Sequence, residues 1–118
     1  MAFWVKVTED AGGYLISRAP AITIGSRRFG LYYEATGNHI DYYGGTGGQN
    51  LLSSTDVFNE WSHIVYTRTS GEKGRIYING SLEATSGSND TQDFSHSDPI
   101  FIGASQGSYT ANNMCQVG

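Results

Sequence analysis

The sequence predicts an all-β fold, an antiparallel β-sandwich of two sheets. Its 118 residues include 16 glycines and 8 tyrosines but only 2 prolines, a composition typical of short aromatic strands joined by many turns. The clearest pattern runs from Trp61 to Gly103, where alternating segments flank an Asn-Gly pair. No segment shows the 3.6-residue period of an amphipathic helix.

The first half of the chain supplies several short candidate strands. Residues 3–7 alternate apolar and polar side chains, and residues 8–13 supply a turn before residues 14–17. This order predicts a first hairpin at the N-terminus. Further strands are expected at residues 19–25, 29–34, 40–43 and 51–52.

The second half of the chain contains a hairpin and the strand that precedes it. Residues 61–68 alternate in such a way that both faces carry apolar bulk, which favours a strand inside a sandwich. Residues 75–78 alternate again, and Asn79-Gly80 supplies the two positive-φ residues of a type I′ turn. A rim loop at 86–97 and a strand at 99–103 follow.

Length and composition indicate one domain over residues 1–118, with its core in 3–103 and a polar tail at 104–118. A mass of 12.8 kDa suffices for a single hydrophobic core. Hydrophobic residues make up 38% of the chain and charged residues only 15%, which argues against disorder driven by charge.

Charge and the N-terminal sequence exclude some classes of partner. The formal net charge is −4, and no basic cluster exceeds the pair Arg27-Arg28, so we expect no nucleic-acid partner. Residues 1–13 have too short an apolar stretch, and an early acidic pair, for a signal peptide or a membrane span. The single cysteine, Cys115, has no partner within the chain. In an exported protein it would pair outside this segment, whereas in the cytosol an odd cysteine has no special meaning, and the sequence leaves both readings open.

The order of several motifs resembles a known family. Their spacing is similar to that of laminin G-like and pentraxin-like domains in the concanavalin A-like lectin/glucanase superfamily. The resemblance implies a concanavalin A-like jelly roll and covers roughly residues 3–103. The motifs are Phe3-Trp4-Val5, Gly13, Leu15, Ser17, Trp61, His63, Tyr77, Asn79-Gly80 and Ile102-Gly103.

Members of this family usually carry a strand before the Phe-Trp segment and closing strands after the Ile-Gly segment. Neither is recognisable in this sequence, so the domain is expected to be truncated at both ends. Missing terminal strands would leave sheet edges unpaired and apolar faces uncovered. We therefore expect a fragment, an unusually short variant, or an assembly in which another copy covers the gap. If the isolated chain folds, we expect a homodimer rather than a monomer.

The resemblance implies a noncatalytic, extracellular or cell-surface binding and adhesion module that recognises a protein or glycan ligand within a larger adhesion protein or receptor. Two alternatives stay open: an accessory or glycan-processing domain of a glucanase-like enzyme, and a structural assembly domain. Related glucanases carry a Glu-x-Asp-x-x-Glu pattern for their catalytic carboxylates, and this sequence lacks it. We expect no enzyme activity, and a packing and hydrogen-bonding role for His63.

Calcium is the cofactor that the resemblance implies, held at the rim of the sandwich. Hard cations prefer several carboxylate and carbonyl oxygens together. A solvated acidic loop is the alternative for the same residues. The candidate ligands are Asp90, Asp93, Asp98 and Asn89, joined by Asp41 or Asp56 from elsewhere. Asn89 also begins the sequon Asn89-Asp90-Thr91, a glycosylation site if the protein is exported.

Exposed aromatic side chains are the candidates for ligand binding. Tyr32, Tyr42 and Tyr43 can stack on sugar rings or anchor a protein surface. Tyr66 and Tyr77 belong to the same group of strand tyrosines. Such tyrosines also fill space between strands and sheets, and the sequence does not separate the two roles.

Overall fold

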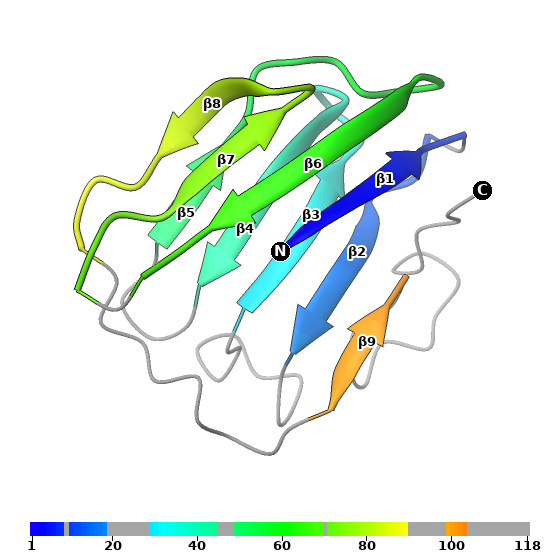
Figure 1. Ribbon diagram of the computed structural model, residues 1–118. Coiled ribbons are helices and arrows are strands. Elements are labelled where there is room, and N and C mark those ends of the chain that lie inside the picture. The colour runs from blue at the N-terminus through cyan, green and yellow to red at the C-terminus, as the bar shows by residue number, and fades with distance from the viewer. Residues whose placement is uncertain (9, 19–28, 45–48, 70, 90–98, 104–118) are drawn as a thin grey trace.

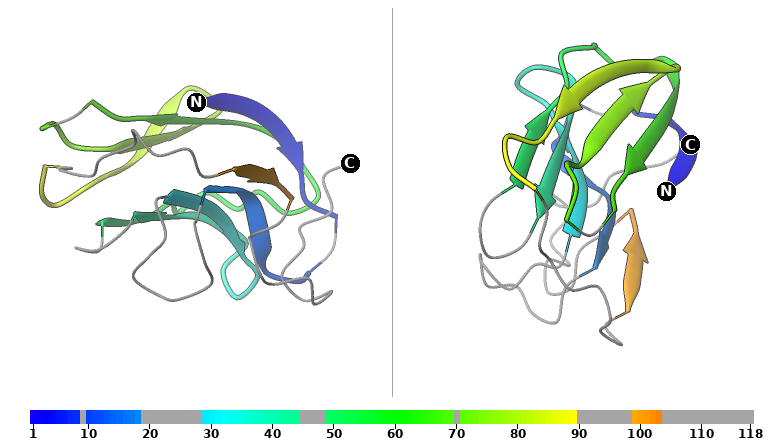
Figure 2. Two further views of the ribbon diagram at one scale, coloured as in Figure 1. Left: turned by 90° about the horizontal axis from the view of Figure 1, so that it is seen from below. Right: turned by 60° about the vertical axis from the view of Figure 1, so that its left-hand side comes forward.

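The computed structural model describes residues 1–8, 10–18, 29–44, 49–69, 71–89 and 99–103. Within these ranges the chain forms nine strands and no helix, arranged as two antiparallel sheets that pack face to face (Figure 1). Figure 2 shows the sheets as two layers. The predicted two-sheet β-sandwich is confirmed.

The smaller sheet has four strands in the order β1-β6-β7-β8. Its strands are β1 (Ala2–Lys6), β6 (Trp61–Thr67), β7 (Arg75–Ile78) and β8 (Ser81–Thr85). The larger sheet has five strands in the order β5-β4-β3-β2-β9. Its strands are β5 (Gln49–Leu52), β4 (His39–Gly44), β3 (Phe29–Glu34), β2 (Gly13–Arg18) and β9 (Ile100–Ile102).

The prediction of a first hairpin is wrong, because β1 and β2 lie in different sheets. β1 pairs with β6, from Ala2 opposite Val65 to Lys6 opposite Trp61, whereas β2 pairs with β3 and β9. Alternation fixes which face of a strand is buried, but it does not fix the neighbouring strand. The chain between β1 and β2 therefore crosses from one sheet to the other.

The Asn-Gly turn is confirmed. Asn79 and Gly80 have φ values of 51° and 86°, as a type I′ turn requires. Asn79 also ties the turn to β6, since its N–H donates to the His63 carbonyl and its Oδ1 accepts from the His63 N–H, both at 2.9 Å. This exchange fixes the position of the hairpin β7-β8 beside β6.

The strands expected at residues 29–34, 40–43, 51–52 and 99–103 are present as β3, β4, β5 and β9. The candidate strand at 19–25 and the tail at 104–118 lie outside the described residues, as does most of the rim loop at 86–97.

The core lies between the two sheets and draws on alternate residues of their inner faces. At its centre the rings of Tyr42 from β4 and Tyr66 from β6 stack at a centroid distance of 4.2 Å with an interplanar angle of 19°. The buried cluster comprises Val5, Val7, Leu15, Leu31, Tyr33, Ile40, Tyr42, Leu51, Val57, Ile64, Tyr66, Ile76 and Ile78.

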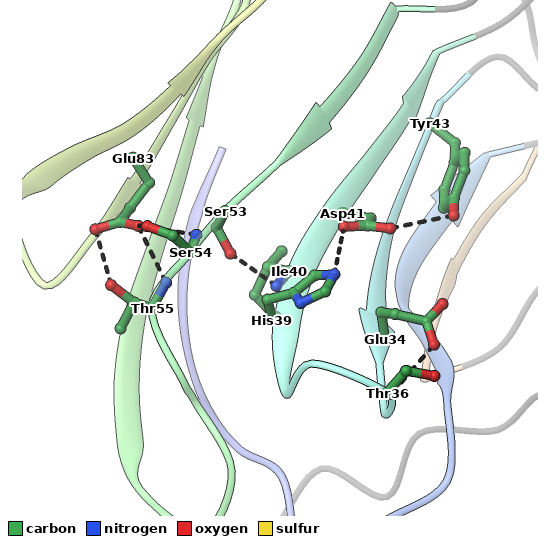
Figure 3. A network of polar contacts seen from close by, with 10 residues as sticks. All are labelled: Glu34, Thr36, His39, Ile40, Asp41, Tyr43, Ser53, Ser54, Thr55 and Glu83. Atoms are coloured by element: carbon green, nitrogen blue, oxygen red, sulfur yellow. Dashed lines mark hydrogen bonds and ion pairs between the residues drawn. The ribbon is translucent and has the colours of Figure 1, made fainter.

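A glutamate on β8 joins the two sheets at one edge (Figure 3). Glu83 Oε2 accepts from the N–H of Ser54, the N–H of Thr55 and the Ser54 hydroxyl at 3.0–3.2 Å. Its Oε1 accepts from the Thr55 hydroxyl at 2.8 Å. The segment after β5 is thereby held against the edge of the four-stranded sheet.

Candidate functional site

The outer face of the five-stranded sheet carries a group of aromatic, acidic and imidazole side chains. Strand alternation on β2, β3 and β4 turns these residues away from the core, because their neighbours in sequence fill it. We call this group the tyrosine face, and it consists of Tyr14, Tyr32, Tyr43, Glu34, His39 and Asp41.

Three tyrosine rings form a row across β2, β3 and β4. Tyr14 and Tyr32 contact edge to face at a centroid distance of 5.1 Å, and Tyr32 and Tyr43 do so at 6.0 Å. Gly30 on β3 makes room for this row, because a Cβ there would lie 2.8 Å from the Tyr14 ring. Edge-to-face packing fixes the ring orientations. Tyr14 is only 5% exposed, so the accessible part of the row consists of Tyr32 and Tyr43, which are partly exposed.

Asp41 occupies the centre of the face and is only 9% exposed. Its Oδ2 accepts a hydrogen bond from the Tyr43 hydroxyl at 3.2 Å, and its Oδ1 lies 3.4 Å from His39 Nε2 (Figure 3). Oδ1 is buried without a hydrogen-bond donor in the described part of the chain. A buried acceptor without a donor costs about 1–3 kcal/mol of stability, and His39 is the ionisable partner nearest to this oxygen in the described residues.

The electrostatics of the face centre on this carboxylate. Burial raises the pKa of Asp41 above its usual value, while the Tyr43 hydrogen bond and His39 oppose the rise and the charge of Glu34 adds to it. Burial, together with the Asp41 charge, raises the pKa of Tyr43 to about 12. Tyr43 therefore remains a hydrogen-bond donor to Asp41 at neutral pH.

Two further residues of β5 extend the face beyond Asp41. Leu52 lies opposite Asp41 in the ladder and is 58% exposed, and Asn50 lies opposite Tyr43 and is also exposed. The result is a surface on which apolar rings and a leucine alternate with amide, carboxylate and imidazole groups.

Comparison with protein families matches residues 1–116 to the laminin G family model described as the concanavalin A-like lectin/glucanases superfamily. The match covers nearly the whole chain and agrees with the two-sheet sandwich. The chain belongs to this superfamily. A search of curated protein sequences gives no match.

As its name indicates, the superfamily includes lectins, which bind saccharides, and glucanases, which cleave them. Membership suggests a binding module at the level of the superfamily and leaves the ligand of this concanavalin A-like domain open. No helix in the described ranges has the length and apolar character to cross a membrane.

The structure separates the tyrosines that the sequence groups together. Tyr32 and Tyr43 are partly exposed on the tyrosine face, as a binding role requires. Tyr42 is 0% exposed and stacks on Tyr66 in the core, so the interpretation of Tyr42 and Tyr66 as exposed ligand-binding residues is wrong. Tyr77 is partly exposed on the outer face of the other sheet.

Sequence reasoning missed three members of the face: Tyr14, Glu34 and His39. It named a fourth, Asp41, only as a possible calcium ligand. A signal for two of them was present, since in the segment from His39 to Tyr43 a period of two places His39, Asp41 and Tyr43 on one side. The contribution of β3 and β2 depends on strand order, which local alternation does not reveal.

The described structure does not test the residues proposed for calcium. Asp90, Asp93 and Asp98 lie outside the described residues, and Asn89 is exposed at the end of a described segment. In the ranges that the structure describes, no group of three or more His, Cys, Asp or Glu side chains could hold a metal ion. Calcium at residues 89–98 therefore stays a prediction, as does glycosylation of Asn89.

His63 lies on the outer face of β6, on the opposite side of the sandwich from the tyrosine face. Its ring packs against Trp4 at a centroid distance of 5.0 Å, and its backbone exchanges hydrogen bonds with Asn79. These contacts agree with a packing and hydrogen-bonding role.

Proposed function

We propose that this domain is a noncatalytic saccharide-binding module and that the tyrosine face is its binding site. The observation that carries the proposal is the buried, partly unsatisfied carboxylate of Asp41 at the centre of a preformed row of tyrosines. Superfamily membership supports a binding role, and the side chains of the site indicate which kind of ligand fits it.

A pyranose ring suits this face because one side of the ring presents C–H groups and its edge presents hydroxyls. The exposed parts of Tyr32 and Tyr43 offer apolar contact to the C–H side. Asp41, His39 and Asn50 offer acceptors and donors to the hydroxyls. A sugar hydroxyl that displaces the His39 ring would give Asp41 Oδ1 the donor that it lacks.

The acidic character of the face favours a neutral saccharide. Glu34 and Asp41 are both carboxylates, and the charge of Glu34 is felt at Asp41. An acidic sugar would meet like charges here, which disfavours its binding.

A binding role is favoured over catalysis because glycosidases need two carboxylates that flank the scissile bond. Asp41 is buried and in contact with Tyr43 and His39, and Glu34 accepts a hydrogen bond from the Thr36 N–H at 3.3 Å. Neither arrangement presents a free carboxylate to a bond held between them. Hydrolysis of a neutral glucan by the purified domain would revive the enzyme alternative.

We also propose, from family membership alone, that the domain acts outside the cell or at its surface as part of a larger adhesion protein or receptor. Its ligand there is a glycan attached to a polymer or to another protein. Detection of the parent protein in surface or secreted fractions tests this location, and its confinement to the cytosol contradicts it.

The test of the binding site is a screen of neutral oligosaccharides, followed by isothermal titration calorimetry with the best one. Asp41→Asn keeps the shape of the side chain and removes its charge. Hydrogen bonds to charged groups are worth about 1.5–3 kcal/mol, so we expect affinity to fall at least tenfold. Tyr77→Ala, which removes a partly exposed tyrosine from the other sheet, is the matched control and should bind normally. Failure of every neutral glycan to bind, or equal binding by Asp41→Asn, refutes the proposal.

A further inference from the structure

The outer face of the four-stranded sheet is apolar where the solvated face of a sheet is normally polar. Antiparallel sheets that cover a core on one side usually turn polar residues outward. Here Trp4 is 62% exposed, Trp61 is 54% exposed and Leu82 is 55% exposed, all on the side away from the core. Figure 1 shows this sheet in front of the other. We call this surface the apolar face, and it consists of Ala2, Trp4, Trp61, Val65, Tyr77 and Leu82.

Strand register brings four of these side chains into one row that crosses the whole sheet. Ala2 on β1 lies opposite Val65 on β6, and Val65 lies opposite Tyr77 on β7. Tyr77 in turn lies opposite Leu82 on β8. Residues that lie directly opposite each other on one face are within side-chain contact, so the row is continuous. The two tryptophans of the chain both lie on one side of this row.

The charges around the apolar face balance, although the chain as a whole carries a formal net charge of −4. Lys6 and Arg75 occupy outward-facing positions of β1 and β7. Two carboxylates lie beside them, since the exposed Glu60 directly precedes Trp61 and Glu83 lies on β8. Two copies of this acidic chain therefore repel each other less at this face than at the acidic tyrosine face.

The area of the apolar face fits a small protein interface. Strands lie about 4.8 Å apart and rise about 3.4 Å per residue, so four strands of about five residues form a face of about 19 by 17 Å. With its projecting side chains such a face offers about 600 Å² to a partner, which is the lower end of the range for specific protein interfaces. The row crosses all four strands, so a ligand that lies along one or two strands leaves the rest of it uncovered.

The order of side-chain sizes makes the row complementary to itself. From β1 to β8 it begins with the small Ala2 and ends with the larger Tyr77 and Leu82. A two-fold axis that runs along the strands, between β6 and β7, reverses the row. This axis places Leu82 over Ala2 of the partner subunit and Tyr77 over Val65 of the partner subunit. Each large side chain then packs against a smaller one.

We propose that two copies of the domain pair through the apolar face, with their four-stranded sheets stacked and their strands aligned. Stacked sheets pack in the same way inside a sandwich, at about 10 Å from each other. The tyrosine face lies on the other side of each sandwich, so both copies keep it uncovered. The dimer thus presents two tyrosine faces that point in opposite directions and can join two saccharide chains. This last consequence rests on the proposed function, whereas the pairing does not.

Sedimentation velocity and intrinsic fluorescence, at protein concentrations from about 2 to 200 µM, test the pairing. We expect an equilibrium of monomer and dimer with a dissociation constant on the order of 10 µM, because the interface is small. The chain has 2 tryptophans, and both belong to the apolar face. Their emission should therefore shift to shorter wavelength over the same concentrations at which the dimer forms.

Three variants locate the contact. Leu82→Lys places two lysines in the interface, one from each copy, and should weaken the dimer at least about tenfold. Ile102→Lys is the matched control, because Ile102 is 76% exposed on β9 at the edge of the other sheet, and it should dimerise normally. The double variant Ala2→Leu/Leu82→Ala exchanges the large and small side chains, so it should dimerise better than Leu82→Ala alone. Circular dichroism of each variant confirms that it is folded.

Several results overturn the proposal. A monomer at every concentration, or dimerisation of Leu82→Lys with the affinity of the wild type, excludes pairing through the apolar face. Loss of the dimer in Ile102→Lys but not in Leu82→Lys would place the contact at the edge of the five-stranded sheet instead. Association without a change in tryptophan emission would place it elsewhere on the surface. Equal dimerisation of Leu82→Ala and the double variant would refute the packing of Leu82 against Ala2 of the partner subunit.

Discussion

Glu83→Gln is expected to loosen the edge of the sandwich in a way that depends on pH. In the wild-type protein one carboxylate accepts four hydrogen bonds from Ser54 and Thr55, at distances between 2.8 and 3.2 Å. Glutamine keeps one carbonyl oxygen and turns an NH₂ group toward donors. Because Glu83 is partly exposed, solvent weakens these hydrogen bonds. We therefore expect the free energy of unfolding to fall by about 2 kcal/mol in total, which is less than the sum of four such bonds to a buried carboxylate.

The pH dependence follows from the pKa of Glu83. The Thr55 hydroxyl, and then the other donors of Ser54 and Thr55, hold the pKa of this carboxyl below its ordinary value. A pKa that is lower in the folded state stabilises the fold above the pKa of the unfolded chain, and this stability is lost as pH falls through the folded value. The difference in free energy of unfolding between wild type and Glu83→Gln should therefore have its maximum value at pH 7 and should decrease below pH 4.

Thermal and urea unfolding of both proteins at pH 7 and pH 3 measures this difference. A loss of about 2 kcal/mol corresponds to a fall of roughly 8 °C in melting temperature for a domain of this size. Glu60→Gln, at an exposed glutamate before β6, is the control for removing a negative charge. The reasoning fails if the two glutamate variants behave alike, or if the Glu83→Gln deficit is the same at pH 3 as at pH 7.

Three further predictions concern the turn, the buried carboxylate and calcium. Asn79→Ala should destabilise the domain by about 1–3 kcal/mol in urea unfolding, because alanine at a φ of 51° is strained and the contacts with His63 are lost. Asn79→Gly should recover part of the lost stability, since glycine adopts this φ without strain. Equal losses in the two variants would contradict the argument from backbone strain. The pKa of Asp41 is raised in the folded state, so its ionisation opposes folding. The stability of the wild type relative to Asp41→Asn should therefore fall as pH rises from 3 to 7. A difference in stability between the two proteins that stays constant over this range would contradict the prediction. Millimolar calcium should raise the melting temperature if residues 89–98 bind the ion, and an unchanged melting temperature rejects that site.

The fold was predictable from sequence where local chemistry determines it. Asn79 and Gly80 specify their turn because few residues other than asparagine and glycine tolerate positive φ at both positions. The strands β3 and β4 follow from alternation in the same way. The partner of β1 was not predictable, since pairing with β6 rather than β2 depends on how two sheets share one core.

The candidate site was predictable only in part. Tyr32 has an even number and Tyr43 an odd one, so alternation along the sequence does not show that they share a face. They do so because the antiparallel pairing of β3 and β4 places Tyr32 opposite Asp41 and Tyr43 opposite Gly30. Tyr42 was misassigned because its neighbours Asp41 and Tyr43 are also polar or aromatic, which hides the buried face. The set of six residues exists only once three strands lie side by side.

The central claim is that the tyrosine face binds a neutral saccharide, and NMR of the labelled domain tests it most directly. On titration with the best oligosaccharide of the screen, the largest amide shifts should fall on β3 and β4, around Tyr32, Asp41 and Tyr43, and Asp41→Asn should abolish them at the same ligand concentration. Saturable shifts confined to the four-stranded sheet, or to loops at the rim, would contradict the account.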